Sequence, residues 1–127
     1  MCIRDRYGTV VSAVDSDGNE IAGIRMPDIR VPLGIHTGWT MRHPDIGGVG
    51  HFMPLQGAVV PFARTKQERQ KSGDHRPSIE ERYSSKEEYL DQIQRATEDM
   101  IGSGYILKED LQSIITGASE RWGAFAR

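Results

Sequence analysis

The chain has 127 residues, of which 37% are hydrophobic and 27% are charged, and its formal net charge is -2. A chain of this length makes one domain and buries about 65–70% of the surface that it exposes when unfolded. The small negative charge gives no general attraction to nucleic acid or to an anionic membrane, and no apolar run approaches the roughly 20 residues of a membrane span. The single cysteine, Cys2, excludes an internal disulfide and a cysteine-based zinc site.

The first six residues resemble the translation of a transposase end sequence, which is left on reads from fragmented sequencing libraries. We therefore expect residues 1–6 to be a non-native leader that plays no part in the fold. On this interpretation Cys2 is not native and the chain is a C-terminal fragment of a longer protein. The alternative is a genuine charged N-terminal tail.

Residues 9–25 are predicted to form a β-hairpin. Two apolar segments, 9–14 and 20–25, flank the sequence Asp15-Ser16-Asp17-Gly18-Asn19. Asp-Gly favours a tight turn because glycine accepts a positive φ without a Cβ clash. The alternation of Asp15, Asp17 and Asn19 also resembles a calcium loop, which needs a glycine at its sixth position and a glutamate at its twelfth. Gly18 stands fourth and Met26 twelfth, so we expect no calcium site here.

Residues 26–60 are rich in proline and glycine. Proline removes a backbone donor and restricts the residue before it, so this segment is predicted to be extended and looping. Short strands are expected near Ile29–Val31 and Ala58–Val60. Such a segment is ordered only where it lies on another part of the protein, and its expected anchors are four large apolar side chains: Trp39, Phe52, Met53 and Leu55.

Three histidines lie in the same segment, at His36, His43 and His51, with Asp45 nearby. A metal site requires several of these side chains to converge, and no HxH or HxxxH spacing places two of them together on one element. A catalytic role for His36 would require a partner nucleophile, which the sequence does not indicate. We therefore expect solvated or hydrogen-bonded loop histidines and no metal.

Residues 61–127 are predicted to be helical. Three pairs match the capping box, in which a hydroxyl and a carboxylate satisfy free amides at a helix start: Thr65 with Glu68, Ser78 with Glu81, and Ser85 with Glu88. Gly73 is expected to end the first helix, and Gly102 or Gly104 the third.

Two apolar stripes recur at helical spacing in the last third of the chain. The first consists of Tyr89, Leu90, Ile93, Ala96, Met100 and Ile101, and the second of Leu111, Ile114, Ile115, Ala118, Trp122 and Phe125. We expect them to face each other as an antiparallel helical hairpin joined by Gly102–Leu107. The mixed charges of residues 61–127 indicate solvated helix faces and no nucleic-acid partner.

Several motifs of catalysis and cofactor binding are missing from the sequence. It contains no Gly-x-Ser-x-Gly elbow, no Walker loop and no HExxH. Gly48-Val49-Gly50 begins a dinucleotide fingerprint, but the third glycine would fall at Met53. Because no nucleophile, base and orienting acid are assembled, we predict no catalytic, cofactor-binding or metal-binding residue within this chain.

Long sequence motifs nevertheless resemble those of a known family. They are Asp15–Pro27, Val31–Leu33, Thr37–Trp39, Arg42, Pro61–Thr65, Glu68-Arg69, Gly73-Asp74, Arg76–Ser78 and Glu80–Tyr83. In this order they resemble the C-terminal region of the bacterial "alpha/beta hydrolase domain" family, from Tyr7 onward. The resemblance implies an α+β fragment of an α/β-hydrolase-like protein, with the hairpin and extended segment at 7–60 and a helical C-terminal subdomain at 61–127, both within one truncated domain.

The resemblance also implies a function for the full-length protein. It is expected to hydrolyse ester-type bonds of a small-molecule substrate through a Ser-His-acid triad that lies upstream of residue 7. In that protein this segment would cover one side of the catalytic sheet, and the Pro32–Trp39 loop would help to wall the substrate site. None of the four histidines matches the family's histidine motif, so no catalytic role is assigned to them. The alternative is a non-catalytic binding or structural module; neither interpretation includes a cofactor or a membrane partner.

Overall fold

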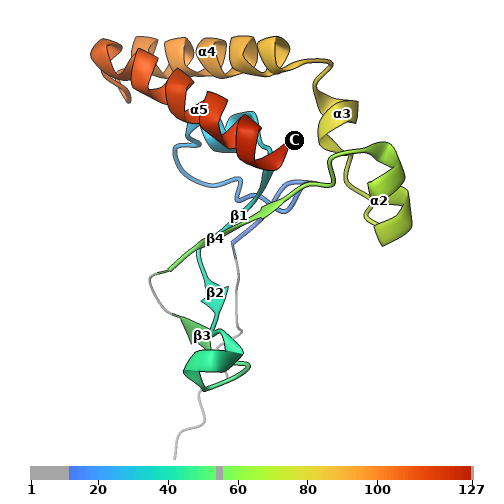
Figure 1. The fold of residues 1–127 in the computed structure, drawn as a ribbon. Helices are drawn as coiled ribbons and strands as arrows, with labels where there is room; N and C mark the ends of the chain where they lie inside the picture. Colours follow the sequence, from blue (N-terminus) through green and yellow to red (C-terminus); the bar gives the residue numbers. More distant parts are fainter. Residues whose placement is uncertain (1–11, 54–55, 127) are drawn as a thin grey trace, which may run out of the picture.

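The computed structural model describes residues 12–53 and 56–126, and it shows two long helices above a narrow β-ribbon (Figure 1). The helices are α1 (Pro27–Arg30), α2 (Lys66–Ser72), α3 (Ile79–Arg82), α4 (Lys86–Gly102) and α5 (Leu111–Phe125), with 3-10 turns η1 (Pro44–Ile46) and η2 (Lys108–Asp110). The strands are β1 (Gly34–Thr37), β2 (Thr40–Met41), β3 (Phe52–Met53) and β4 (Ala58–Pro61). The predicted α+β character, with helices in the C-terminal half, is thus confirmed.

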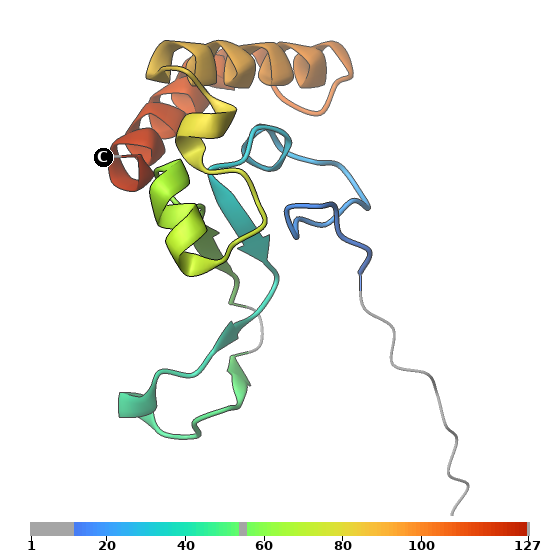
Figure 2. The same cartoon turned by 90° about the vertical axis from the view of Figure 1, so that its right-hand side faces the viewer.

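The ribbon consists of two short antiparallel ladders in series. β1 pairs with β4, from Gly34 opposite Pro61 to Thr37 opposite Ala58, and β2 pairs with β3 further out. The outer ladder and η1 project away from the helices in both views (Figures 1 and 2). The strand expected at Ala58–Val60 is confirmed as β4, whereas β1 was not predicted.

The hairpin predicted at residues 9–25 is present only around its turn. Val14 and Glu20 form one isolated antiparallel bridge, and Gly18 has the positive φ of 93° that the tight turn requires. Residues 21–25 form no strand, so that part of the prediction is wrong. Residues 9–11 lie outside the described part of the chain.

The prediction of a strand near Ile29–Val31 is also wrong, because Ile29 and Arg30 belong to α1 and Val31 is its C-cap. Pro27 is at the first helical position, where its fixed φ and missing N–H suit a helix start, and Asp28 complements the N-terminal dipole. Pro32 then disfavours helical geometry at Val31, whose φ of -126° and ψ of 72° end the turn.

The predicted helix starts are confirmed, with one difference in geometry. The hydroxyls of Thr65 and Ser85 accept the backbone N–H of Glu68 and Glu88, at 3.1 and 3.2 Å. The Ser78 hydroxyl instead donates to Glu81 Oε2 at 2.8 Å. At Ser78 the box is reciprocal, since Glu81 Oε2 accepts the Ser78 N–H at 2.9 Å. In the other two, the glutamate accepts the N–H of the residue before the cap, at Arg64 and Ser84.

The helix ends also follow the sequence. Gly73 caps α2 in the left-handed conformation, with a φ of 73°, and α4 ends at Gly102. The two long helices pack as predicted, because Tyr89 near the start of α4 stacks against Trp122 near the end of α5, with ring centroids 5.2 Å apart.

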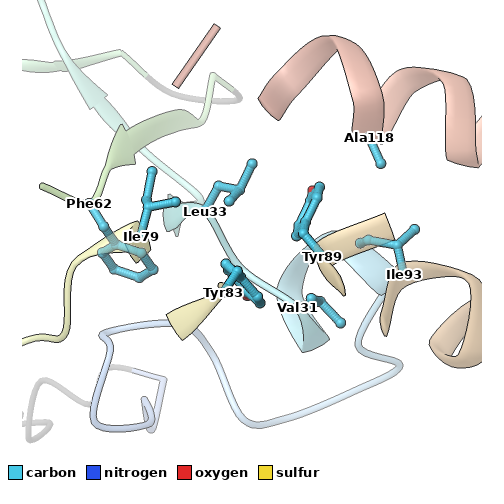
Figure 3. Close-up of a cluster of buried hydrophobic side chains, with 8 residues drawn as sticks. All are labelled: Val31, Leu33, Phe62, Ile79, Tyr83, Tyr89, Ile93 and Ala118. Atoms are coloured by element: carbon cyan, nitrogen blue, oxygen red, sulfur yellow. The ribbon is translucent and has the colours of Figure 1, made fainter. Parts of the chain in front are cut away.

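The hydrophobic core lies between the helices and the base of the ribbon (Figure 3). Its buried members come from both halves of the chain: Val31, Leu33, Phe62, Ile79, Tyr83, Tyr89, Ile93 and Ala118. The buried Tyr83 hydroxyl donates to the carbonyl of Pro32 at 3.0 Å, and burial raises the pKa of this phenol. The start of β1 is therefore fixed directly to the helical core.

The aromatic anchors expected in the extended segment are not buried. Trp39 is 53% exposed and Phe52 is 61% exposed, and they pack edge to face on each other with centroids 5.2 Å apart. Met53 is half-buried, and Leu55 lies outside the described residues. The residues that do anchor the segment are Val31 and Leu33, because they directly follow α1 and enter the core.

Close packing of the two strands makes Gly34 a sensitive position. A Cβ there would lie 2.5 Å from the Val60 carbonyl oxygen and 3.0 Å from the Pro61 Cα, both backbone atoms of the paired strand. We expect Gly34→Ala to lower the free energy of unfolding by about 1–3 kcal/mol, since overpacking forces the strands apart. Gly38→Ala is the matched control, because no described atom lies within 4 Å of its Cβ position. Thermal melts of equal midpoint for the two variants would contradict this packing.

The Ser78 capping box predicts a specific loss of stability in acid. The Arg69 guanidinium, followed by the N–H and hydroxyl of Ser78, lowers the pKa of Glu81 from 4.5 to about 2. Because the folded pKa is the lower one, this stabilisation is complete above about pH 4.5 and is lost as the pH falls towards 2. Glu81→Gln should lower stability at pH 6 and flatten the decline between pH 4.5 and 2, measured by urea unfolding. Glu120→Gln, at an exposed position of α5, is the charge-matched control, and equal changes in both variants would contradict the role of the box.

Candidate functional site

A groove of about 640 Å³ lies between the turn at residues 15–19 and the outer part of β1. Val14, Ile35 and Trp39 provide much of its apolar lining, and Glu20 and His36 are its titratable members. This volume falls within the roughly 300–1,000 Å³ of small-molecule pockets. Residues 35–39 belong to the Pro32–Trp39 loop that the sequence analysis associated with a substrate site, so we take this groove as the candidate site.

The floor of the groove is held by the side chain of Asn19, which is fully buried. Its Nδ2 donates to the Gly34 carbonyl at 3.2 Å, and its Oδ1 accepts the His36 N–H at 2.7 Å. These two groups lie on alternate residues of β1, on the edge away from β4, where a neighbouring strand would bond. A single amide side chain thus takes the place of a strand and fixes the path of Ile35 and His36.

Asp15 shapes the turn that carries Asn19. Its Oδ1 accepts the N–H groups of Asp17 and Asn19 at 3.0 Å each, and its Oδ2 pairs with Arg25 at 2.6 Å. Burial opposes ionisation of Asp15, but the Asn19 N–H and the Arg25 guanidinium outweigh it and lower the pKa of this carboxyl. The turn is therefore formed around a carboxylate that remains charged.

Asp17 fastens the same turn to the helical half of the chain. Both of its carboxylate oxygens bond the guanidinium of Arg82, in the fork geometry typical of strong Arg–carboxylate pairs. Arg82 lies 4.2 Å above the centroid of the buried Phe62 ring, and its Nε donates to the Pro77 carbonyl at 2.9 Å. The groove is thus built on a turn that the core itself holds.

The oxygens of the Asp15, Asp17 and Asn19 pattern are therefore engaged by protein donors, and they serve as structural acceptors. The histidines are dispersed: His43 accepts the Asp45 N–H at 3.3 Å on the exposed ribbon tip, and His51 is exposed. Among residues 12–53 and 56–126, no three His, Cys, Asp or Glu side chains gather as a metal site.

His36 is the titratable residue closest to a chemical role in the groove. It is half-buried, and desolvation lowers its pKa, with Asp28 raising it and Arg121 lowering it further. The neighbouring hydroxyl of Thr37 donates to the Trp39 carbonyl at 2.6 Å and accepts the Ala58 N–H at 3.2 Å, so it serves the backbone. The described groove thus offers a wall with a neutral imidazole, and its nearest hydroxyl has a structural role.

Sequence reasoning missed the central role of Asn19. It treated this residue as part of a turn and of a calcium pattern, because both readings use only local spacing. One signal in the sequence could have pointed to this turn, because the family-like motifs contain two acidic and two basic residues that pair in the structure. The pairs are Asp15 with Arg25 and Asp17 with Arg82. Complementary charges far apart in the sequence could have indicated a fixed polar turn.

Removal of the Asn19 amide tests this account of the groove. Asn19→Ala would leave the Gly34 carbonyl and the His36 N–H without their partner, and each unsatisfied buried group costs about 1–3 kcal/mol. We expect a loss of about 2–4 kcal/mol in urea unfolding. The control is Ser16→Ala, in the same turn but exposed, which should change little. Similar losses for both variants would show that the amide bridge does not hold β1.

Comparison with known proteins places these features in a family. The family model described as "Alpha/beta hydrolase domain" matches residues 4–116, and this range includes the polar turn, the groove and most of the helical half. No curated protein and no solved structure matches the chain. The helices of the described residues include none that is long and apolar enough to cross a membrane. Because the match covers most of its length, the chain belongs to the alpha/beta hydrolase domain family.

Proposed function

We propose that this chain is the C-terminal part of a longer hydrolase that cleaves ester-type bonds in a small-molecule substrate. In this proposal the groove between residues 15–19 and β1 forms one wall of the substrate site. The observation that carries it is a preformed, mostly apolar groove on a member of a hydrolase family. Its walls are fixed by the Asn19 and Asp17 contacts, so it can orient a substrate without first becoming ordered.

The chemical step is assigned to residues that precede this chain. A serine hydrolase of this type presents its nucleophile on a glycine-flanked turn beside oxyanion donors, followed along the chain by the acid and then the histidine. The sequence contains no such turn. We therefore place the serine, acid and histidine upstream of residue 7, with no catalytic residue in the chain itself.

The apolar side chains exposed on the ribbon support the proposal that another segment of the same polypeptide covers it. Residues 34–61 contain only two Asp, Glu, Lys or Arg side chains, Arg42 and Asp45. Apart from the groove residue Trp39, large apolar side chains are exposed along the same segment: Met41, Ile46, Val49, Phe52, Val59 and Val60. An apolar patch of this kind is typical of a surface that another protein segment covers. We assign this cover to the upstream part of the hydrolase.

Activity measurements on two lengths of the protein test the proposal. The 127-residue chain should not hydrolyse 4-nitrophenyl butyrate above a protein blank. The protein encoded by the reading frame extended upstream, without residues 1–6, should hydrolyse it and should lose this activity when the glycine-flanked serine is changed to alanine. A continuous upstream frame without such a serine, or a start codon next to Tyr7, would favour the non-catalytic binding module instead.

The role of the groove is tested in the same longer protein. Trp39→Ala should raise KM several-fold with little change in kcat, because it removes a binding wall and leaves the reacting groups in place. Leu107→Ala, at an exposed apolar residue in the connection after α4, is the matched control. An unchanged KM for the Trp39 variant would remove the groove from the substrate site.

A further inference from the structure

The charged part of the groove lining is negative. Among the described residues that line it, Glu20 is the only Asp, Glu, Lys or Arg, and it lies beside the apolar surfaces of Val14, Ile35 and Trp39. Glu20 is tied to the turn through its backbone bridge to Val14, whereas its side chain is exposed. The backbone from which this carboxylate extends at the groove is therefore set by the same turn that Asp15 and Asn19 hold.

The charges around Glu20 are already compensated. Asp15 pairs with Arg25 and Asp17 pairs with Arg82, while no ion pair of Glu20 occurs among the described residues. Desolvation lowers the pKa of His36 and so disfavours a positive charge on its imidazole. The groove consequently carries about one net negative charge next to a mostly apolar lining.

Trp39 adds a second feature that favours a cation. This residue is 53% exposed, its ring packs edge to face on Phe52, and its carbonyl accepts the Thr37 hydroxyl at 2.6 Å. An indole in a fixed orientation attracts ammonium groups through its quadrupole as well as hydrocarbon through its area. A carboxylate ligand, by contrast, would be repelled by Glu20, and the described part of the lining offers it no Lys or Arg side chain.

We infer that the groove binds ligands in which an apolar body is joined to a positively charged amine, with the body against Val14, Ile35 and Trp39 and the amine towards Glu20. This ligand class would be the substrate class of the site. The inference rests on the proposed function only where it treats the ligand as a substrate. Binding itself requires no upstream residue, so the 127-residue chain can be used to measure it.

Trp39 provides the signal for a direct test. The chain has two tryptophans, so Trp122→Phe leaves Trp39 as the single tryptophan emitter. At pH 7 and low salt, this protein is titrated with benzylammonium, benzyl alcohol and benzoate, which share one aromatic ring and differ in charge. We expect saturable changes with Kd on the order of millimolar for benzylammonium, three- to ten-fold weaker binding of benzyl alcohol, and weaker binding still of benzoate.

The carboxylate is tested by adding Glu20→Gln to the same background. The preference for benzylammonium over benzyl alcohol should disappear, while binding of benzyl alcohol should remain. Glu109→Gln, at an exposed position of η2, should keep the full preference. Raising the salt concentration should weaken benzylammonium selectively, because the exposed charge is screened. If Trp122→Phe proves unfolded by circular dichroism, the indole N–H resonance of Trp39 in the native chain gives the same titration.

Three results would overturn the inference: benzoate binding as tightly as benzylammonium, a preference that survives Glu20→Gln, or no saturable response at Trp39. The proposed function fails separately, on the longer protein. Ester hydrolysis without any preference for amine-bearing esters would reject only the ligand class. Retained benzylammonium binding with no hydrolysis by the longer protein would reject only the hydrolase assignment.

Discussion

The structure of the groove depends on one buried amide, that of Asn19. A two-stranded ladder has a free edge on each side, and a free edge beside the core leaves backbone groups that need partners. Asn19 satisfies one N–H and one carbonyl of β1 at once, and it thereby fixes the strand without a third strand. The turn that delivers this amide is itself ordered by the Asp15 carboxylate, which accepts the N–H of Asn19.

Ion pairs connect the turn and α1 to the other helices. Asp17 bonds Arg82 at the end of α3, while Asp28 of α1 bonds Arg121 of α5, and Arg30 of α1 bonds Asp99 of α4. Each pair joins residues more than 60 positions apart in the sequence, so the polar turn, α1 and the helical hairpin are held as one unit. The exposed pairs contribute little stability individually, and their main effect is to fix the orientation of segments that the core already brings together.

This division of roles explains what the chain can contribute to a hydrolase. Its polar side chains near the groove are occupied in structural bonds, as the Thr37 hydroxyl and the Asp15 carboxylate show. The surfaces that remain for a ligand are Val14, Ile35, Trp39 and the carboxylate of Glu20. Such a lining can contact and orient a ligand but has little chemistry of its own, and this is the role that the proposed function gives it. The ribbon beside it exposes large apolar side chains, which is the surface that we propose the upstream segment covers.

The sequence by itself determined the features whose partners lie within a few residues. The caps at Thr65, Ser78 and Ser85, the stop at Gly73 and the apolar stripes of α4 and α5 were all predictable, because helical bonds join residues three or four apart. The turn at Gly18 was predictable for the same reason. The family was also predictable, because its motifs are stretches of sequence that need no structure to be recognised. Only the tertiary structure decided that Ile29–Val31 ends a helical turn, that Gly34–Thr37 pairs with a strand more than 20 residues away, and that Trp39 and Phe52 remain exposed. It alone brought Asn19 to β1 and Asp17 to Arg82, because the free energy of those contacts depends on distances that the folded core creates.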